Sequence, residues 1–152
     1  MLEAWRIVKE KHAATAFSGE GAARAGGRWN SRGTLIVYTS ATRALAALET
    51  LVHLNPPVFF KYVAMRAQFE APLIEKVAVD HLPVDWRTEP PALSTKVLGD
   101  RWIREKRSAI LQLPSAIIPG EVNYLLNPAH PDFGKIQIGD PEAFNFDPRL
   151  LS

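Results

Sequence analysis

A glycine-rich loop, followed at once by a short apolar strand and a capped helix, is the feature that most constrains this fold. The loop spans residues 26–33, and its two adjacent glycines allow backbone conformations that residues with a Cβ resist. Residues 35–37 are apolar and β-branched, which predicts a buried strand. Ser40 and Thr42 then offer N-caps to an Ala- and Leu-rich helix over residues 43–54. Loop, strand and helix are therefore expected to form one compact unit.

This unit carries several side chains with useful chemistry. Arg28 and Trp29 stand side by side on the loop, Tyr38 ends the strand, and Glu49 lies on the helix. The planar guanidinium of an arginine suits phosphates and carboxylates, and a glycine-rich loop leaves backbone amides accessible beside it. We therefore expect a small-molecule site here, with Arg28, Tyr38 and Glu49 as the residues that act on the ligand.

The rest of the chain is typical of short strands with few helices. Further strands are expected over residues 2–8, 58–68, 72–79, 109–113, 135–138 and 144–147. A second helix, capped by Ser94, is expected over residues 95–106, and the first helix should stop at Asn55-Pro56-Pro57. Segments 9–25 and 83–91 are expected as loops, the first with one helical turn, and 114–119 as a strand edge.

The pattern of elements favours an α+β fold over a doubly wound parallel sheet, because strands outnumber helices and do not alternate with them regularly. No linker or change of composition interrupts the 152 residues, so we expect a single compact domain over residues 1–152.

The composition excludes several classes of protein. The sequence has no cysteine, which excludes disulfides and thiol catalysis and suits a reducing cytosol. It has no apolar run of about 18 residues and no basic-then-apolar leader, so neither a membrane span nor a secretory signal is expected. The net charge of +2 is a weak basis for nucleic-acid binding. We therefore expect a cytoplasmic protein.

The position of Glu49 on its helix leaves two interpretations open. At about 100° per residue, Glu49 lies at the border of the apolar face formed by Leu45, Leu48 and Val52. A carboxylate there is partly desolvated, so its charge acts strongly on any cation that approaches. The alternative is a boundary glutamate paired with His53 one turn later.

The other candidates also have structural interpretations. Arg28 can be a loop arginine stacked on Trp29 or held in a surface ion pair, and Tyr38 can be a core aromatic. Ser115, between two prolines, has no evident base to make it a nucleophile and is better suited to a hydrogen bond with ligand or backbone. The amide of Asn123 can cap local backbone or bind a ligand, and spacing alone does not separate these.

Metal-binding and nucleotide-binding motifs are not recognisable. The four histidines are scattered without metal-ligand spacing, so no metal site is expected. Gly19-Glu20-Gly21 lacks the strand and the third glycine of a dinucleotide-binding fold. The basic cluster at residues 101–107 is interspersed with acids, which favours a solvated or partner-binding face over a DNA reader.

Several ordered blocks of the sequence resemble the RES-domain family, which is named for an arginine, a glutamate and a serine. Arg28, Glu49 and Ser115 match these three residues. The blocks that carry the resemblance are Trp5-Arg6, Gly27-Arg28-Trp29-Asn30, Val37-Tyr38-Thr39-Ser40, Ala47-Leu48-Glu49, Leu113-Pro114-Ser115, residues 121–128 and residues 146–150. The resemblance runs over nearly the whole chain, although residues 58–112 carry little of it.

The resemblance implies a fold, an activity and a partner. Members of that family look like ADP-ribosyltransferases in fold and are bacterial toxins of RES–Xre toxin–antitoxin pairs. They consume NAD as their substrate, either degrading it or transferring its ADP-ribose, so no cofactor is expected. The Xre-type antitoxin has a helix-turn-helix part and blocks the toxin's site, which implies that DNA is contacted only through the antitoxin.

The resemblance also implies a role for each candidate. Glu49 would stabilise the positive ribose that forms as nicotinamide departs, and Arg28 would hold the pyrophosphate or orient the ribose. The remaining roles are a sandwich around nicotinamide by Tyr38 and Trp29, and hydrogen bonds to the ribose or the nicotinamide amide from Ser115 and Asn123. The acceptor stays open between water, phosphate and a protein. The alternatives are a protein ADP-ribosyltransferase and a nucleic-acid-binding or RNA-cleaving toxin that uses residues 101–107.

Overall fold

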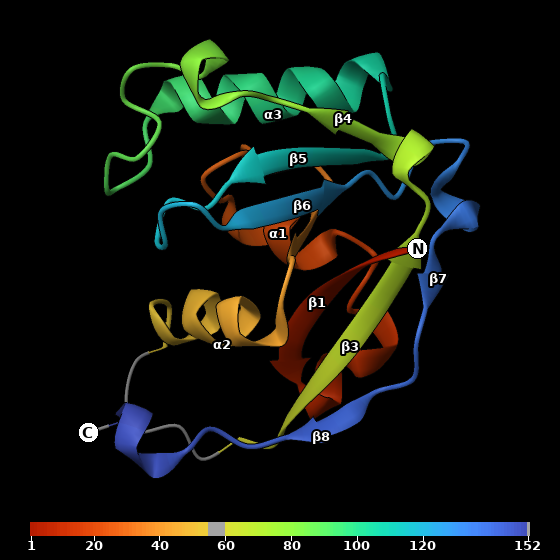
Figure 1. Cartoon of the computed structure of the whole chain (residues 1–152), viewed down its shortest axis with the longest axis vertical. Coiled ribbons are helices and arrows are strands. Elements are labelled where there is room, and N and C mark those ends of the chain that lie inside the picture. The colour runs from red at the N-terminus through yellow and green to blue at the C-terminus, as the bar shows by residue number, and fades with distance from the viewer. Residues whose placement is uncertain (55–59, 152) are drawn as a thin grey trace.

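A curled, mostly antiparallel sheet with helices at its faces and edges organises the chain (Figure 1). The computed structural model describes residues 1–54 and 60–151. The strands are β1 Leu2–Lys9, β2 Val37–Ser40, β3 Tyr62–Phe69, β4 Ile74–Lys76, β5 Ile110–Pro114, β6 Val122–Leu126, β7 Gln137–Ile138 and β8 Glu142–Phe144. The helices are α1 Glu20–Ala25, α2 Arg43–Leu51 and α3 Leu93–Glu105, with short 3-10 turns between elements. These elements confirm the α+β fold class.

The sheet has the order β4-β5-β6-β2-β1-β3-β7, and β8 pairs with β3 beside β7. The long ladder of β1 and β3 runs from Leu2↔Phe69 to Lys9↔Tyr62. The ladder of β1 and β2 is short, with the register Trp5↔Ser40, and the sheet turns there from its β5–β6 half into its β1–β3 half. Figure 1 shows α2 beside this turn, where it packs on β1 and β2, while α3 runs past β4 and β5 at the top of the view.

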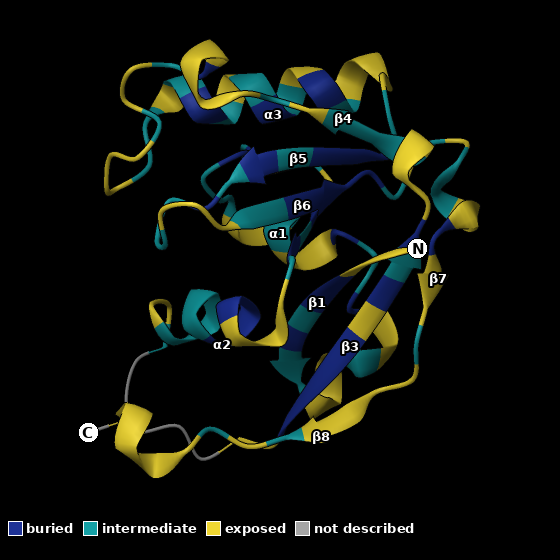
Figure 2. Cartoon of the chain, in the orientation of Figure 1, coloured by how far each residue is buried: buried dark blue, intermediate teal, exposed yellow. Residues whose placement is uncertain are grey.

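The core forms separate apolar clusters on the two halves of the sheet. One, beneath α3, includes Trp29, Trp102 and Leu125. Another, beneath α2, includes Trp5 and Ala46. Figure 2 shows buried residues along β5, β6 and β3, whereas exposed and buried positions follow one another along α3. Helices α2 and α3 therefore each bury one stripe of residues against the sheet, which leaves the opposite stripe to solvent.

The first helix confirms the capping prediction at Thr42, whose hydroxyl oxygen accepts a 3.0 Å hydrogen bond from the Leu45 amide. The strand before it is displaced from residues 35–37 to Val37–Ser40, and Leu35 is 41% exposed. Ser40 therefore lies in the strand and does not cap the helix. The helix ends at Leu51 and not at residue 54, so Val52 lies past its end and is 58% exposed.

Several other boundaries differ from the sequence prediction. Asn55-Pro56-Pro57 and residues 58–59 lie outside the described residues, and β3 begins at Tyr62. The strand expected over 72–79 is confined to Ile74–Lys76, because 3-10 turns flank it on both sides. Helix α3 begins at Leu93 after the N-cap position Ala92. Ser94 is therefore inside the helix, where its hydroxyl donates to Asp85 instead of capping.

The remaining differences concern short segments. The stretch 9–25 holds a 3-10 turn and the helix α1, which is more helix than the one turn expected. Residues 116–120 form bends and turns after β5 in place of the strand edge expected over 114–119, and residues 122–126 form β6, a strand that was not predicted. The strand expected over 135–138 is confined to Gln137–Ile138, and the one expected over 144–147 lies earlier, at Glu142–Phe144. Among the described residues, no helix is long and apolar enough to cross a membrane.

Candidate functional site

The carboxylate of Glu49 is held by a serine from a distant part of the chain. Glu49 is half-buried on α2, and the hydroxyl of Ser115 donates a 3.1 Å hydrogen bond to its Oε1. Ser115 is itself 2% exposed, at the end of β5. The predicted border position of Glu49 is thus confirmed, but its partner is Ser115, whereas His53 is exposed and forms no ion pair among the described residues.

The hydroxyl of Ser115 is also fixed from its other side. Its oxygen accepts hydrogen bonds of 3.1 Å from the amides of Ile117 and Ile118, and its own amide donates to the Glu121 carbonyl at 2.8 Å. A serine hydroxyl has one proton and two acceptor lone pairs, so this network uses all of them. The backbone bonds expected for Ser115 are therefore present, and its hydroxyl proton orients Glu49.

The local sequence explains why the serine stands there. Pro114 ends β5, and the chain then turns through residues 115–121 before β6 begins at Val122. A serine at the start of such a turn readily bonds backbone amides two and three positions ahead, as this one does. The end of β5, the start of β6 and the end of β2 lie together at one end of the sheet, beside the start of α2.

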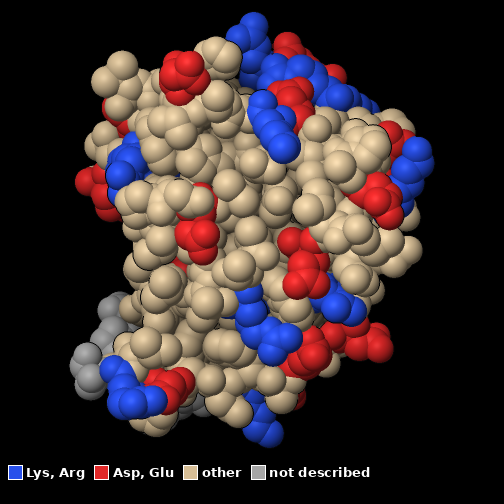
Figure 3. Space-filling model, in the orientation of Figure 1, with Lys and Arg blue, Asp and Glu red and all other residues tan. Residues whose placement is uncertain are grey.

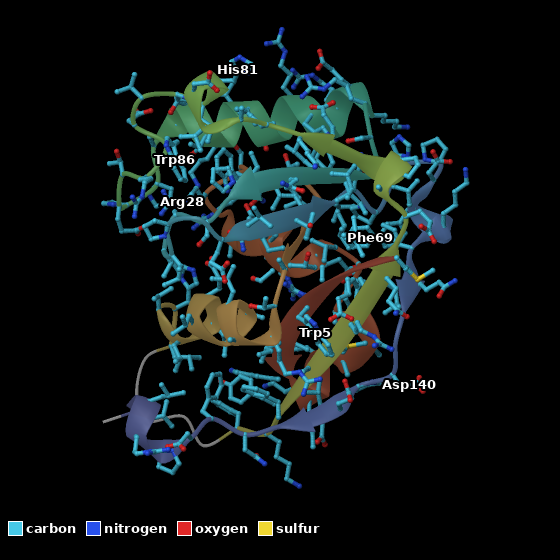
Figure 4. All side chains as sticks on the ribbon, viewed as in Figure 1. Trp5, Arg28, Phe69, His81, Trp86 and Asp140 are labelled. Carbon is cyan, nitrogen blue, oxygen red and sulfur yellow. The ribbon has the colours of Figure 1, made fainter. Side chains whose placement is uncertain are left out.

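Arg28 lies at the same end of the sheet, under the loop that contains Trp86 (Figure 4). Its Nη1 donates to the carbonyls of Trp86 at 3.1 Å and Thr88 at 2.8 Å. Its Nη2 donates to Glu89 Oε2 at 2.8 Å in an ion pair in which Arg28 is 17% exposed and Glu89 70% exposed. The surface ion pair that the sequence left open for Arg28 is therefore present. The sequence did not indicate Glu89 as the partner of Arg28.

The donors of Arg28 are only partly used by these contacts. A guanidinium has five N–H donors, and the described residues accept from three of them. The Nε–H and one Nη2–H have no acceptor among the described residues. These two donors, on Nε and Nη2, can bond a phosphate or a carboxylate.

A single loop connects the surroundings of Arg28 to those of Glu49. Residues 86–89 supply three acceptors to Arg28, and Arg87 of the same loop donates from Nη2 to the Ala116 carbonyl at 3.1 Å. Ala116 follows Ser115, which bonds Glu49. The guanidinium and the carboxylate are therefore held on one connected framework, without an ion pair between them.

Tyr38 supports the loop of Arg28 through its hydroxyl. The hydroxyl donates to Asn30 Oδ1 at 2.6 Å and accepts from the Trp29 amide at 3.0 Å. Burial raises the pKa of Tyr38 well above the ordinary value of a phenol, so the side chain stays neutral at physiological pH. Its ring is half-buried at β2, which leaves part of it available for contact with a ligand.

Two other predicted residues have mainly structural contacts. Trp29 is 3% exposed in the apolar cluster with Trp102, so in this arrangement its ring offers no face to a ligand, contrary to the expected sandwich. Asn123 lies on β6 opposite Ser40, and its amide donates to the Thr39 carbonyl at 3.3 Å and to Ser40 Oγ at 3.1 Å. The amide oxygen of Asn123 has no partner among the described residues.

Several residues that shape this region were missed by the sequence reasoning. Asn30 is fully buried and bonds the Ala22, Ser31 and Thr34 carbonyls as well as Tyr38. Arg6 on β1 donates to the Ala16 carbonyl and, at 3.0 Å, to the Tyr38 carbonyl, and burial lowers its pKa to about 10. The sequence signal for Arg6 was a charged residue inside a strand with apolar neighbours. No local pattern indicated Glu89, or Lys96 and Asp100 on α3.

The basic cluster of residues 101–107 is partly neutralised by its neighbours. Arg101 pairs with Glu105, and Arg107 pairs with both Glu105 and Glu75. Figure 3 shows this mixture of charges at the top of the view, over α3 and β4. A hollow of about 340 Å³ adjoins it, lined by Val77, Ser94, Val97, Leu98, Arg101 and Arg107. Neither Arg28 nor Glu49 lines this hollow, so we do not assign it to the site.

Within residues 1–54 and 60–151, no three His, Asp or Glu side chains gather closely enough to bind a metal ion. The candidate site therefore consists of a held carboxylate, a partly used guanidinium, a neutral tyrosine and an asparagine amide. That set can bind an anionic ligand and stabilise positive charge next to it.

Comparisons with known proteins show the family to which the chain belongs. The family described as RES domain matches residues 3–147. A relative named Prs ADP-ribosylating toxin, from Sphingobium sp. (strain YBL2), is 40% identical over 153 residues, which is 97% of this chain and 95% of the relative. A protein named Toxin Res, from Yersinia enterocolitica, is 34% identical over 148 residues, which is 96% of this chain and 97% of that protein.

The fold has a counterpart among solved structures. The crystal structure of the M.tuberculosis MbcT–MbcA toxin–antitoxin complex contains a chain that matches with a TM-score of 0.71 and 17% sequence identity. The match covers 95% of this chain and 84% of that chain. At this identity the likeness concerns the fold alone.

Proposed function

Because the chain belongs to the RES-domain family of toxins, we propose that it is the toxin of a toxin–antitoxin pair and that it cleaves the nicotinamide–ribose bond of NAD. The action would deplete NAD in the cytoplasm. NAD would be its substrate, and no resident cofactor takes part in the proposed chemistry.

Glu49 is the residue on which the proposed chemistry depends. When the bond between nicotinamide and ribose breaks, the ribose becomes oxocarbenium-like and carries positive charge. A fixed carboxylate beside that carbon stabilises the charge as it develops and does not have to reorganise first. Nicotinamide departs as a neutral base because it was cationic in NAD, so no proton donor is required for the departure. The bond from Ser115 holds Glu49 in a single orientation for this step.

The other residues bind and orient the substrate in this proposal. Arg28 binds the pyrophosphate through its Nε–H and its second Nη2–H, the two donors without an acceptor among the described residues, while its other Nη2–H bonds Glu89. The half-buried ring of Tyr38 contacts nicotinamide, and its neutral hydroxyl maintains the Arg28 loop. The amide oxygen of Asn123 accepts from a ribose hydroxyl or from the nicotinamide amide.

The observation that carries the proposal is the bond from Ser115 to the half-buried carboxylate of Glu49 at the sheet end where Arg28 also lies. A surface carboxylate needs no such support. The fixed position of the Glu49 carboxylate fits an electrostatic role in a reaction that creates positive charge.

The test is to incubate the purified protein with NAD and measure released nicotinamide. Glu49→Gln keeps the shape but removes the charge, and release should fall at least about 100-fold, the usual cost of losing one electrostatic stabiliser of a transition state. Glu70→Gln is the matched control, because Glu70 is exposed and its side chain makes no hydrogen bond or ion pair among the described residues. Equal release by wild type and Glu49→Gln would refute the proposal.

A second function, transfer of ADP-ribose to a protein, is favoured by one observation: the relative that is 40% identical is named as an ADP-ribosylating toxin. The residues that cleave the bond would be the same, and only the acceptor would differ. Running the assay with and without phosphate, and searching cellular proteins for added ADP-ribose by mass spectrometry, separates water, phosphate and protein as acceptors.

The proposed partner is an Xre-type helix-turn-helix antitoxin. A fold neighbour of this chain was solved as a toxin–antitoxin complex, which supports an antitoxin partner for this chain as well. DNA would then be contacted through the antitoxin. The paired charges of residues 101–107 give the RNA-cleaving alternative no support.

A further inference from the structure

One face of α3 holds the backbone of the loop that carries Arg28. Lys96, Gly99 and Asp100 have the i, i+3 and i+4 spacing that places them on one side of a helix. All three approach the loop of residues 26–33, at Gly27, Trp29 and Ser31 respectively. Alternate loop residues therefore contact α3, and Arg28 lies between two of them.

Lys96 holds the residue just before Arg28. Its Nζ donates a 2.5 Å hydrogen bond to the carbonyl of Gly27, and its side chain is half-buried. Gly27 is also paired with Asn30 across the loop, with its amide 3.0 Å from the Asn30 carbonyl. A charged donor on this carbonyl thus fixes the peptide that leads directly into Arg28.

Asp100 holds the other side of the loop. Its Oδ1 accepts a 2.9 Å hydrogen bond from the amide of Ser31. Between the two anchors, Gly99 lets the helix approach the backbone of Trp29, since a Cβ at this position would overlap the Trp29 carbonyl oxygen. The helix and loop are therefore in direct backbone contact, with a charged side chain anchoring the loop on each side.

We propose that Lys96 and Asp100 are positioning residues for Arg28: by fixing Gly27 and Ser31 they aim the guanidinium at the anionic part of the substrate. This inference rests on the proposed consumption of NAD, in which Arg28 binds the pyrophosphate. Neither residue needs to touch the substrate, because each acts through the loop backbone.

The experiment compares Lys96→Met with Arg104→Met. Both remove one positive charge from α3, but Arg104 is exposed and makes no hydrogen bond or ion pair among the described residues. Two quantities are measured for each variant: the hydrogen–deuterium exchange of backbone amides in residues 26–33, and the KM and kcat for NAD.

In Lys96→Met, exchange in the loop should accelerate, and KM should rise about tenfold while kcat changes by less than about threefold, because a contact made equally in ground and transition states is lost. Lys96→Arg keeps a charged donor and should restore most of the KM. Asp100→Ala should act like Lys96→Met, whereas Asp100→Asn keeps an acceptor for Ser31 and should resemble wild type.

The outcomes separate this inference from the proposed function. If Lys96→Met and Arg104→Met agree in loop exchange and in KM while wild type consumes NAD, the positioning role is refuted and the function stands. A raised KM without faster loop exchange also refutes it, since Lys96 would then contact the substrate directly. If wild type releases no nicotinamide but the loop exchange accelerates in Lys96→Met and Asp100→Ala, the anchoring of the loop stands and the NAD proposal fails.

Discussion

The hydroxyl of Ser115 donates to the carboxylate of Glu49 across 66 positions of sequence, at a distance of 3.1 Å. The serine oxygen is oriented by two backbone amides, so its proton can point only toward Glu49. The residue that follows β5 therefore positions a carboxylate that belongs to α2. The orientation of Glu49 on α2 therefore depends on how the chain folds at the end of β5.

Replacing Ser115 by Ala should lower both activity and stability. Two amides and one carboxylate lose their partner inside the protein, which costs about 1–3 kcal/mol of unfolding free energy for a buried unsatisfied group. The kcat for nicotinamide release should fall about tenfold or more, because Glu49 loses its fixed orientation. Chemical denaturation and the NAD assay measure the two effects. Ser94→Ala, which removes a hydroxyl that donates to Asp85 and not to Glu49, is the control. An unchanged kcat would show that Glu49 needs no support.

Local features of the sequence predicted local structure well. The helix α2 follows from Thr42 and a run of Ala and Leu, since its cap and its periodicity both lie within a few residues. The position of Glu49 on that helix was predictable for the same reason. The start of β2 was not, because Val37–Ser40 is a strand by virtue of its pairing with β6, some 80 residues away.

Partners far apart in sequence were not predictable. Arg28 bonds acceptors that lie 58 to 61 positions ahead in a proline-rich loop without a pattern of its own. The family resemblance implied that Trp29 stacks on the ligand, yet tertiary packing buries it beside Trp102. A glycine inside a helix is unfavourable by propensity, whereas the structure shows that α3 needs Gly99 to approach Trp29. The close backbone contact at this position therefore outweighs the low helical propensity of glycine.

Replacing Gly99 by Ala should destabilise the protein although alanine favours helices. The new Cβ would overlap the Trp29 carbonyl oxygen, and backbone on both sides restricts any movement. Overpacking of this kind costs about 1–3 kcal/mol or more. Gly21→Ala in α1 is the matched control, because a Cβ there meets nothing within 4 Å and should be neutral or stabilising by up to about 1 kcal/mol. Urea unfolding of both variants tests this, and equal midpoints would contradict the close contact.

The tyrosines should make the protein sensitive to high pH. Burial raises the pKa of all three, Tyr38, Tyr62 and Tyr124, above that of the unfolded chain. A raised folded pKa favours the folded state only below the unfolded pKa, near about 10, and this contribution is lost as the pH rises further. We expect the free energy of unfolding to fall above about pH 10. Absorbance of phenolate should appear together with unfolding, and phenolate forming in the folded protein near the ordinary pKa would contradict this.

Removing the charge of Glu89 should improve substrate binding. In the free protein its carboxylate occupies Nη2 of Arg28, the group that would bind the pyrophosphate of NAD. Because Glu89 is 70% exposed, the ion pair is worth no more than about 1 kcal/mol, so Glu89→Gln should lower the KM for NAD by at most about fivefold. The kcat and the melting temperature should change little, since the carbonyls of Trp86 and Thr88 still hold Nη1.

The control for this comparison is Glu121→Gln, which removes a negative charge from the 115–121 turn, where the carboxylate makes no hydrogen bond or ion pair among the described residues. It separates a general change of charge from the loss of the Arg28 contact. A KM that rises in Glu89→Gln would mean that the carboxylate helps to hold Arg28 in place rather than competing with the substrate. A KM that falls equally in both variants would assign the effect to net charge, because NAD is itself an anion.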